Sequence, residues 1–385
     1  MRGEIKIDKL SSFCKVIAGQ SPKGSAFNEE GIGVEFHQGK KAFGPHYIEP
    51  SNVWTTEITK LAQPGDILMS VRAPVGPTNF TDREVCIGRG LAAIRCKEDV
   101  LPHFILYALK SIESKIVGKD GAVFNSIGKD MIEDLPVPAF DRTEQQRIVD
   151  ILDQEFAKID ALKANAEKSL QAAKDLFQAT LKRELEPKEG WKSYCLKDVC
   201  KEYGDYGMSL PSKPYDGIRY LRITDITEWG DLNDDRVSVD AGEVEERYMV
   251  RNGDILFART GATVGKTLVY EDKFGSCCYA GYLIRYRPDQ SIVIPRMLYY
   301  ITHSASYYEW VAISQKSATL PNISAKLYNA YELTLPHIKE QERIISRLDA
   351  LNDKCQTLQD NYQKALALCD DLKQSLLRKA FNGEL

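Results

Sequence analysis

The chain has 385 residues, of which 43% are hydrophobic and 28% are charged, and its formal net charge is −4. This length allows about two to four domains. There is no run of about 18 apolar residues, and the first residues lack the apolar core of a signal peptide, so we expect no membrane-spanning segment. The nine cysteines are scattered without a Cys-x-x-Cys pair, which favours buried thiols in a reducing cytoplasm over disulfides or a zinc site.

Residues 1–140 have the pattern of a globular domain with both strands and helices. Short apolar runs between glycine, proline and asparagine turns predict strands at 66–71 and 91–96, and residues 101–115 predict a helix. This domain contains 17 basic and 17 acidic residues. Because DNA-binding domains are usually basic, a positive face here requires either segregation of the charges or a contribution from partner subunits.

Residues 141–188 predict one long amphipathic helix that ends before Pro187 and Gly190. Its apolar residues recur at alternating steps of four and three, which is typical of a coiled-coil seam. The seam consists of Ile148, Leu152, Ile159, Leu162, Ala166, Ala173 and Leu176. It is interrupted at Glu155, Ser169 and Thr180, and it is widened by Phe156, Leu170, Phe177 and Leu181.

Residues 189–336 repeat the order of the first domain, with 17 basic and 19 acidic residues in 191–336. Strands are predicted at 219–223, 254–258 and 281–286, and a helix at 296–311. The segment from Pro64 to Leu68 recurs here as the segment from Asn252 to Leu256, with Gly-Asp-Ile-Leu in common. In each half an arginine follows within a few residues: Arg72 in the first and Arg259 in the second.

Residues 337–385 predict a second long helix with the same kind of seam. About 40 helical residues form a rod of roughly 60 Å, and a rod with one apolar seam requires a partner helix. We expect this partner to be the helix at 141–188, paired antiparallel. The seam residues are Ile344, Leu348, Leu351, Cys355, Leu358, Tyr362, Ala365, Cys369, Leu372 and Leu376.

The two halves together predict a duplicated α/β (α+β) protein with a pseudo-two-fold internal repeat. Its segments are a globular domain at 1–140, a central helix at 141–188, a second globular domain at 189–336 and a final helix at 337–385. Of the 19 tyrosines, 16 lie between Tyr194 and Tyr331. A shared scaffold with different loops favours recognition of two different targets, such as two separated half-sites on DNA.

The sequence contains no set of residues that points to catalysis. An Asn/Asp-Pro-Pro-Tyr/Phe loop and a glycine-rich cofactor site, which an amine methyltransferase needs, are both absent. The segment from Gly261 to Thr267 resembles a phosphate-binding loop but is one residue too short. The five histidines have no metal-ligand spacing, and the acidic clusters are typical of solvated loops. We therefore expect no catalytic residue, no metal and no cofactor.

Several motifs together resemble the specificity subunit of type I restriction–modification enzymes over essentially the whole chain. They are Leu135-Pro-Val-Pro138 before Glu144-Gln145-Gln146-Arg147-Ile148, Leu333-Thr-Leu-Pro336 before Glu340-Gln341-Glu342-Arg343-Ile344, the paired Gly-Asp-Ile-Leu segments, and the end from Gln374 to Leu385. One departure is that two extra residues separate Pro138 from Glu144 in the first half.

The resemblance implies a non-catalytic subunit with two target recognition domains, each reading half of a bipartite double-stranded DNA site. The helices would set the spacer and dock two DNA-adenine methyltransferase (modification) subunits, and restriction/translocase subunits would complete the complex in the cytoplasm. Two other interpretations from the residues alone are a coiled-coil scaffold whose end domains bind proteins, and a fragment that dimerises. The presence of both halves argues against the fragment.

Candidate DNA contacts are polar residues in loops and at strand ends, where arginine suits guanine, Asn or Gln suits adenine, and the threonine methyl suits thymine. In the first domain they are Ser21, Lys23, Gln38, Lys40, Lys41, Arg72, Arg89 and Asn125. In the second they are Ser209, Arg222, Thr224, Asp225, Arg259, Thr260, Lys266, Gln315, Lys316 and Asn322. For each, an ordinary solvated side chain is the alternative, and for the two repeated arginines the alternative is support of a turn.

The helix starts carry the candidate partner-binding residues Glu144, Gln145, Arg147, Glu340, Gln341 and Arg343. Two roles remain open for them: they cap the helices and fix the orientation of each globular domain, or they face a methyltransferase subunit.

Overall fold

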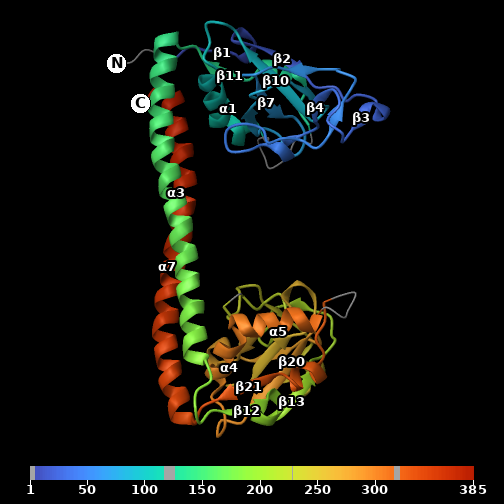
Figure 1. The fold of residues 1–385 in the computed structure, drawn as a ribbon, viewed down its shortest axis with the longest axis vertical. Helices are drawn as coiled ribbons and strands as arrows, with labels where there is room; N and C mark the ends of the chain where they lie inside the picture. The colour runs from blue at the N-terminus through green and yellow to red at the C-terminus, as the bar shows by residue number, and fades with distance from the viewer. Residues whose placement is uncertain (1–4, 117–125, 228, 316–320) are drawn as a thin grey trace. The chain divides into compact units, whose positions relative to one another are not determined.

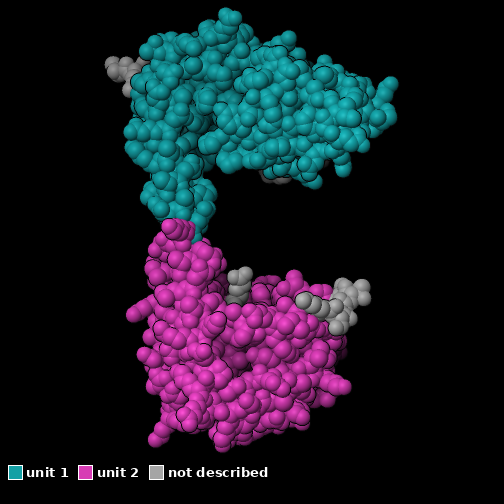
Figure 2. Space-filling model, viewed as in Figure 1, with its two compact units in different colours: residues 1–167, 363–385 teal, residues 168–362 magenta. Residues whose placement is uncertain are grey.

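The structure is a computed structural model that describes residues 5–116, 126–227, 229–315 and 321–385. The chain forms two compact units (Figure 2). Unit 1 consists of residues 1–167 and 363–385, and unit 2 consists of residues 168–362. The sequence elements can be followed along the ribbon in Figure 1.

Unit 1 is built on an antiparallel four-stranded sheet in the order β2-β10-β7-β8. Its strands are β2 (Cys14–Ala18), β10 (Leu91–Cys96), β7 (Ile67–Ser70) and β8 (Thr78–Phe80). Strand β7 is buried along its whole length because both faces of the sheet are covered. Helix α1 (Pro102–Ile116) packs its apolar side, including Phe104, into the same core as Ile67 and Ile94.

A second sheet of unit 1 has the order β3-β5-β4-β9-β6. These strands are β3 (Phe27–Asn28), β5 (Trp54–Thr55), β4 (Val34–His37), β9 (Val85–Ile87) and β6 (Leu61–Ala62), and β4 pairs with β9 in parallel. Strand β1 (Ile7–Lys9) pairs with β11 (Pro136–Pro138), which directly precedes the first long helix, and the short helix α2 (Lys129–Glu133) precedes β11. The start of the chain is therefore anchored beside the entry to that helix.

Unit 2 repeats this plan. Its four-stranded sheet has the order β13-β20-β17-β18, from Cys200–Tyr206, Leu283–Pro288, Ile255–Ala258 and Thr267–Val269. The parallel pair is β15 (Arg219–Leu221) with β19 (Cys277–Tyr279), and the pair before the second long helix is β12 (Lys192–Cys195) with β21 (Glu332–Leu335). Strands β14 (Lys213–Pro214) and β16 (Val237–Ser238) form a further pair, and α6 spans Ala325–Asn329. The predicted duplication of a mixed α/β domain is confirmed.

The helix predicted at 296–311 is instead two helices, α4 (Pro295–Thr302) and α5 (Ala305–Gln315). The break follows from Ser304, whose Oγ accepts a hydrogen bond from the amide of Tyr307 at 3.3 Å and so satisfies one of the first amides of α5. The prediction of a single helix was wrong, because the apolar residues keep their helical spacing across Ser304 although the first helix ends before it.

The two long helices are α3 (Arg142–Leu185) and α7 (Ile338–Phe381), each of 44 residues. In unit 1, Lys163 pairs with Asp370 at 2.8 Å, and Lys373 pairs with Asp160 at 2.5 Å. Residue numbers rise along one helix as they fall along the other, so the pairing is antiparallel in this unit. In unit 2 the later part of α3 packs in one core with the beginning of α7, as expected.

The predicted seam is correct at some positions and wrong at others. Ile148, Leu152, Ile159, Ile344, Leu348 and Cys355 are buried, but Leu162, Leu176, Leu358 and Leu372 are 59%, 55%, 43% and 48% exposed. The buried line passes instead through neighbours such as Phe177, Leu181, Asn352 and Gln359. A helix with 3.6 residues per turn drifts by about 20° per heptad from a strict 3.5-residue repeat, so the buried line moves to the adjacent residue. Among the described residues, no helix is both long and apolar enough to span a membrane.

Candidate nucleic-acid interface

In unit 1, several predicted DNA-contact residues meet at one edge of the four-stranded sheet. The amide of Gly19 donates to the carbonyl of Leu91 at 2.9 Å, which places the turn after β2 next to the beginning of β10. The amide of Val71 donates to Gly90 at 3.0 Å, which adds the turn after β7. These turns carry Ser21, Arg89 and Arg72.

Gln38 joins the same edge from the second sheet. It follows His37, whose carbonyl accepts a hydrogen bond from the amide of Gly88 at 2.8 Å. The hydroxyl of Ser21 donates to Oε1 of Gln38 at 2.9 Å, and the amide of Arg89 donates to that hydroxyl at 3.4 Å. Position 90 must be glycine, because a Cβ there would lie 2.2 Å from the carbonyl oxygen of Gln38. Ser21, Gln38, Arg72 and Arg89 are therefore presented together.

Unit 2 builds the same edge with equivalent hydrogen bonds. The amide of Gly207 donates to Leu283 at 3.2 Å, as Gly19 does in unit 1, and Ser209 therefore matches Ser21. Ser21 and Ser209, both predicted DNA contacts, therefore occupy equivalent positions and have the same side chain.

The residue that follows the parallel strand, β4 in unit 1 and β15 in unit 2, has a different side chain in each unit. The amide of Ala280 donates to Leu221 at 2.9 Å, which corresponds to the bond that His37 accepts in unit 1. Arg222, which follows Leu221, therefore matches Gln38. An arginine and a glutamine, which favour different bases, occupy the same place on the backbone.

The repeated arginines are not equivalent, contrary to the sequence comparison. Thr260 forms an antiparallel bridge with Asn322, as Arg72 does with Ser126. Arg259 therefore corresponds to Val71, the buried residue before Arg72. Counted from the shared Gly-Asp-Ile-Leu motif, Arg72 lies one residue further along the chain than Arg259, so the two arginines do not occupy the same position.

Arg259 is held in place at the edge of unit 2. Its guanidinium carbon lies 4.7 Å from the centroid of the Tyr206 ring, and its Nε donates to Oδ1 of Asn322 at 3.4 Å. The hydroxyl of Tyr206 accepts a hydrogen bond from the amide of Ala325 at 2.9 Å. Tyr282, whose carbonyl accepts from the amide of Arg259, is 61% exposed. Both tyrosines were missed, although the enrichment of tyrosine in the second half was the available signal.

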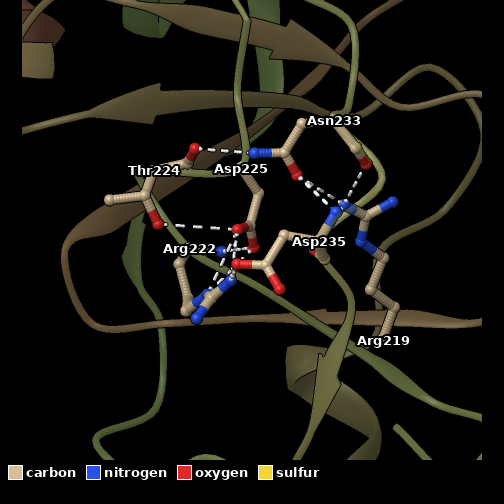
Figure 3. Close-up of polar contacts among 6 residues, drawn as sticks. All are labelled: Arg219, Arg222, Thr224, Asp225, Asn233 and Asp235. Carbon is tan, nitrogen blue, oxygen red and sulfur yellow. Dashed lines mark hydrogen bonds and ion pairs between the residues drawn. The ribbon is translucent and has the colours of Figure 1, made fainter. Parts of the chain in front are cut away.

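Arg222, Thr224 and Asp225 belong to a network of six residues (Figure 3). The Arg222 guanidinium donates to Asp225 Oδ1 at 2.7 Å and to Asp235 Oδ2 at 2.8 Å, and its backbone amide donates to Asp225 Oδ2 at 2.8 Å. The hydrogen bonds that the guanidinium donates to these carboxylates, above all those to Asp225, raise the pKa of Arg222. Asp225 is fully buried, so we assign it to orienting Arg222 rather than to contact with a base.

The other half of the network joins the neighbouring loop to strand β15. Arg219, which is buried, donates to the carbonyl of Asn233 at 2.7 Å and to that of Asp235 at 3.1 Å. The Asn233 amide in turn donates to the carbonyl of Thr224 at 3.1 Å. The turn that carries Arg222 and the loop that carries Asp235 are thus fixed to each other (Figure 3).

The remaining predicted contacts lie elsewhere or outside the described residues. Lys23, Lys40 and Lys41 are exposed, the last two in the short 3-10 helix Lys40–Ala42. Lys266 and Gln315 line a cavity next to α3. Asn125 and Lys316 lie outside the described residues.

The repeated Gly-Asp-Ile-Leu motif has a structural role in both units. Asp66 accepts two hydrogen bonds from the Arg95 guanidinium, at 2.9 and 2.7 Å, and Asp254 accepts two from Arg287, at 2.8 and 3.1 Å. Each aspartate also accepts from a backbone amide three residues earlier, at 2.8 and 2.9 Å. In both units the motif therefore supplies a buried aspartate whose ion pair joins the turn before the central strand to the neighbouring strand.

The glutamines at the two helix starts fasten each globular domain to its helix. Gln145 accepts from the amide of Leu101 at 3.0 Å and donates to the carbonyl of Phe140 at 2.9 Å. Gln341 accepts from the amide of Ile294 at 3.0 Å and donates to carbonyl oxygens at 292 and 336, both at 2.9 Å. Both side chains are buried, which favours the orienting role for these two residues.

The charged residues at the helix starts form ion pairs one turn apart. Arg147 donates to Glu144 at 2.6 and 2.8 Å, and Arg343 donates to Glu340 at 2.5 and 2.7 Å. The side chains of Arg147 and Arg343 are 40% and 44% exposed. Unlike the glutamines, these pairs are accessible to a partner.

A tyrosine–aspartate hydrogen bond provides a second attachment in each unit. Tyr107 of α1 donates to Asp153 of α3, and Tyr300 of α4 donates to Asp349 of α7. Burial and the neighbouring carboxylate raise the pKa of both tyrosines, so both remain neutral donors.

The duplicated edges and the two helix attachments define a protein with two copies of one structural module. The family model for the type I restriction modification DNA specificity domain matches residues 3–172 and 188–367. The chain therefore belongs to the type I restriction–modification specificity subunit family.

Known proteins resemble the chain at two levels. It is 26% identical over 354 residues to the type I restriction enzyme EcoBI specificity subunit of Escherichia coli, covering 84% of this chain and 74% of that protein. It is 45% identical over 139 residues to a Methanocaldococcus jannaschii protein provisionally named the MjaX specificity subunit, a match that spans 35% of this chain and only 32% of that relative.

Two solved structures share the fold. One, a chain solved to describe complex assembly and conformational transition of the type I R-M system, has a TM-score of 0.77 at 20% identity, with 99% of this chain and 98% of that chain covered. The HsdS subunit of Thermoanaerobacter tengcongensis has a TM-score of 0.52 at 19% identity, with 99% and 97% covered.

Proposed function

We propose that this chain is the non-catalytic subunit that selects the DNA sequence for a type I restriction–modification complex. Unit 1 and unit 2 would each supply a target recognition domain that reads one half of an asymmetric bipartite site. The carrying observation is that equivalent backbone positions hold different side chains: Gln38 against Arg222, and Arg72 against Thr260. Backbone positions would thus be shared while the base preference differs.

The side chains at the two edges suit direct readout in the major groove. Glutamine pairs with adenine through two hydrogen bonds, arginine with guanine, and the threonine methyl contacts thymine, each good bidentate pair discriminating by about 1–3 kcal/mol. Tyr206 and Asn322 would hold Arg259 in a reading position, as Asp225 holds Arg222. Preorganised arginines lose less side-chain entropy when they bind.

The helices would set the spacer and dock two methyltransferase subunits, and restriction/translocase subunits would complete the enzyme. We assign Gln145 and Gln341 to domain orientation, because both are buried and fully engaged. Glu144, Arg147, Glu340 and Arg343 remain our candidates for contact with a partner subunit. No step of the reaction is assigned to a residue of this chain.

The ruler role has its own test. Inserting one heptad after Ala164 in α3 and one after Asn361 in α7 adds about 10 Å to each helix. We expect the spacer of the recognised site to lengthen by roughly three base pairs, with the half-site bases unchanged. An unchanged spacer in a variant that still methylates DNA would contradict the ruler role.

The central experiment maps adenine methylation across the genome of a host that lacks it. The host expresses this chain with a candidate methyltransferase subunit from the same organism, and a control host expresses that methyltransferase alone. A two-part asymmetric motif that appears only with this chain supports the proposal. If the chain neither binds the methyltransferase nor changes methylation, the proposal fails and a protein-binding scaffold becomes the better interpretation.

A further inference from the structure

Unit 2 contains a cavity that the proposed DNA edge does not use. Its volume is about 600 Å³, and it lies between α3, α5 and the turn that follows Gly261. Phe177, Trp229, Val264 and Val311 provide an apolar and aromatic wall. Small-molecule sites typically occupy about 300–1,000 Å³ and combine such a wall with a few polar groups.

Two lysines that line this cavity have no carboxylate partner among the described residues. Among the described residues, Lys174 forms no ion pair, and the Lys266 ammonium group contacts only the carbonyl of Ile226, at 3.5 Å. Both lysines are half-buried, and each ammonium group beside the apolar wall attracts a group of opposite charge. The cavity is therefore suited to a ligand that carries negative charge.

His303 supplies a polar group of a different kind. Its side chain is buried, and its Nδ1 is hydrogen-bonded to the Tyr299 carbonyl at 2.7 Å, which leaves Nε2 as an acceptor without a partner in the described part of the chain. Burial lowers the pKa of His303 to about 4, so the ring is neutral at physiological pH. Because His303 lines the cavity, an N–H or O–H group of a ligand can donate to Nε2.

The corresponding junction of unit 1 has a different charge pattern. A cavity there is lined by Asp153, Asp160 and Lys373, and Lys373 already forms an ion pair with Asp160 at 2.5 Å. The combination of a histidine acceptor with lysines that have no carboxylate partner in the described part of the chain is therefore not a consequence of the shared fold. It belongs to the sequence of unit 2.

We propose that the unit 2 cavity binds a small aromatic anion. Its planar ring would lie against Trp229 and Phe177, its anionic group would lie between Lys174 and Lys266, and a donor group on the ring would reach His303. Nucleotides and aromatic carboxylates share this chemistry. The inference rests on the cavity alone and is independent of the DNA role.

The test measures binding to the full chain by isothermal titration calorimetry, with adenosine 5′-monophosphate and indole-3-acetate as probes. Adenosine and inorganic phosphate are the controls, because each lacks one half of the proposed ligand. We expect at least one aromatic anion to bind with a Kd of about 1 mM or tighter and both controls to bind at least tenfold more weakly. Binding of only one anion identifies which source of the shared chemistry the cavity accepts.

Variants connect the binding to the cavity. The double variant Lys174→Gln/Lys266→Gln is expected to weaken binding at least tenfold, and the matched variant Lys197→Gln, at an exposed site, is expected to leave it unchanged. His303→Phe keeps an aromatic side chain but removes the acceptor, and its fold is checked by circular dichroism. The proposal is overturned if neither anion binds, or if the double variant binds as tightly as the unchanged chain.

Discussion

Arg222 donates to two carboxylates that differ sharply in exposure, since the Asp225 side chain is 1% exposed and that of Asp235 is 68% exposed. Asp225 is held inside the fold, whereas Asp235 can leave the guanidinium when another acceptor arrives. An exposed ion pair contributes about 0.2–1 kcal/mol. Asp235 therefore covers the donors of Arg222 at small energetic cost.

Replacing Asp235 is expected to increase DNA affinity. In Asp235→Asn, Arg222 remains oriented by Asp225 but competes with one fewer anion, so the assembled complex should bind its motif about two- to fivefold more tightly. Fluorescence anisotropy at fixed salt measures this. Asp234→Asn is the control, because it removes the same charge at the neighbouring exposed residue. An equal gain in both variants would point to general charge rather than to Arg222.

Exchanging Arg222 is expected to change one half-site only. Arg222→Gln should relax or replace one guanine in the half-site of unit 2, with a loss of about 1–3 kcal/mol for the original base. The half-site of unit 1 serves as the internal control and should not change. Gln38→Arg should have the reciprocal effect. Methylation mapping reads both outcomes, and a change in both half-sites from one substitution would refute the equivalence of these positions.

Removing the Gln341 side chain is expected to loosen unit 2. Gln341→Ala leaves the amide of Ile294 and the two carbonyl oxygens without their buried partners, which should lower the free energy of unfolding by about 2–4 kcal/mol. Urea denaturation followed by circular dichroism measures the loss. Glu342→Ala, at an exposed neighbour, should change it by less than about 0.5 kcal/mol.

Acid is expected to destabilise the chain through His303. Its pKa is about 4 in the fold and about 6.5 when unfolded, so the unfolded chain binds the extra proton between these values. Stability should therefore fall as the pH decreases from 6.5 to 4, by up to about 3 kcal/mol. His303→Asn should flatten the pH dependence of Tm over this window. His46→Asn, at an exposed histidine, should not.

Acid also acts on Glu35 of unit 1, but over a lower range. Burial favours its neutral form, yet hydrogen bonds from Arg83, from the amide of Ser51 and from His37 outweigh this and lower the pKa of Glu35 to about 2. Its contribution to stability is lost as the pH falls from about 4.5 to 2, below the range of His303. Burial also lowers the pKa of His37, so both buried histidines contribute to the loss of stability above about pH 4, whereas Glu35 accounts for a loss at lower pH.

Repetition made much of the fold predictable, because two copies of one pattern support each other. The long helices, the two mixed domains and the importance of Gln145 and Gln341 followed from segments that recur. The exposure of Leu162 and Leu358 could not be predicted in this way. An α-helix has 3.6 residues per turn rather than 3.5, so the line of buried residues drifts away from the heptad positions.

Prediction of the candidate edge was less complete. Polar residues at strand ends pointed to Ser21, Gln38 and Arg222, since turns next to paired strands lie close together. The sequence could not show that Asp225 is buried or that Tyr206 supports Arg259, because both depend on contacts between distant segments. The one-residue offset between Arg72 and Arg259 could be counted from the shared Gly-Asp-Ile-Leu motif, and the strand register confirms it.

The two units differ in whether their residues are continuous in the sequence. Unit 2 is one continuous stretch, but unit 1 needs the last residues, because Leu377, Ala380 and Phe381 share its core with Phe104 and Leu152. During synthesis on the ribosome, unit 1 therefore cannot complete its core until the C-terminal residues have been made. Unit 2, although its sequence follows most of unit 1, can complete its core earlier. Until then the nascent chain exposes an apolar surface around Phe104, which is the kind of surface that chaperones bind.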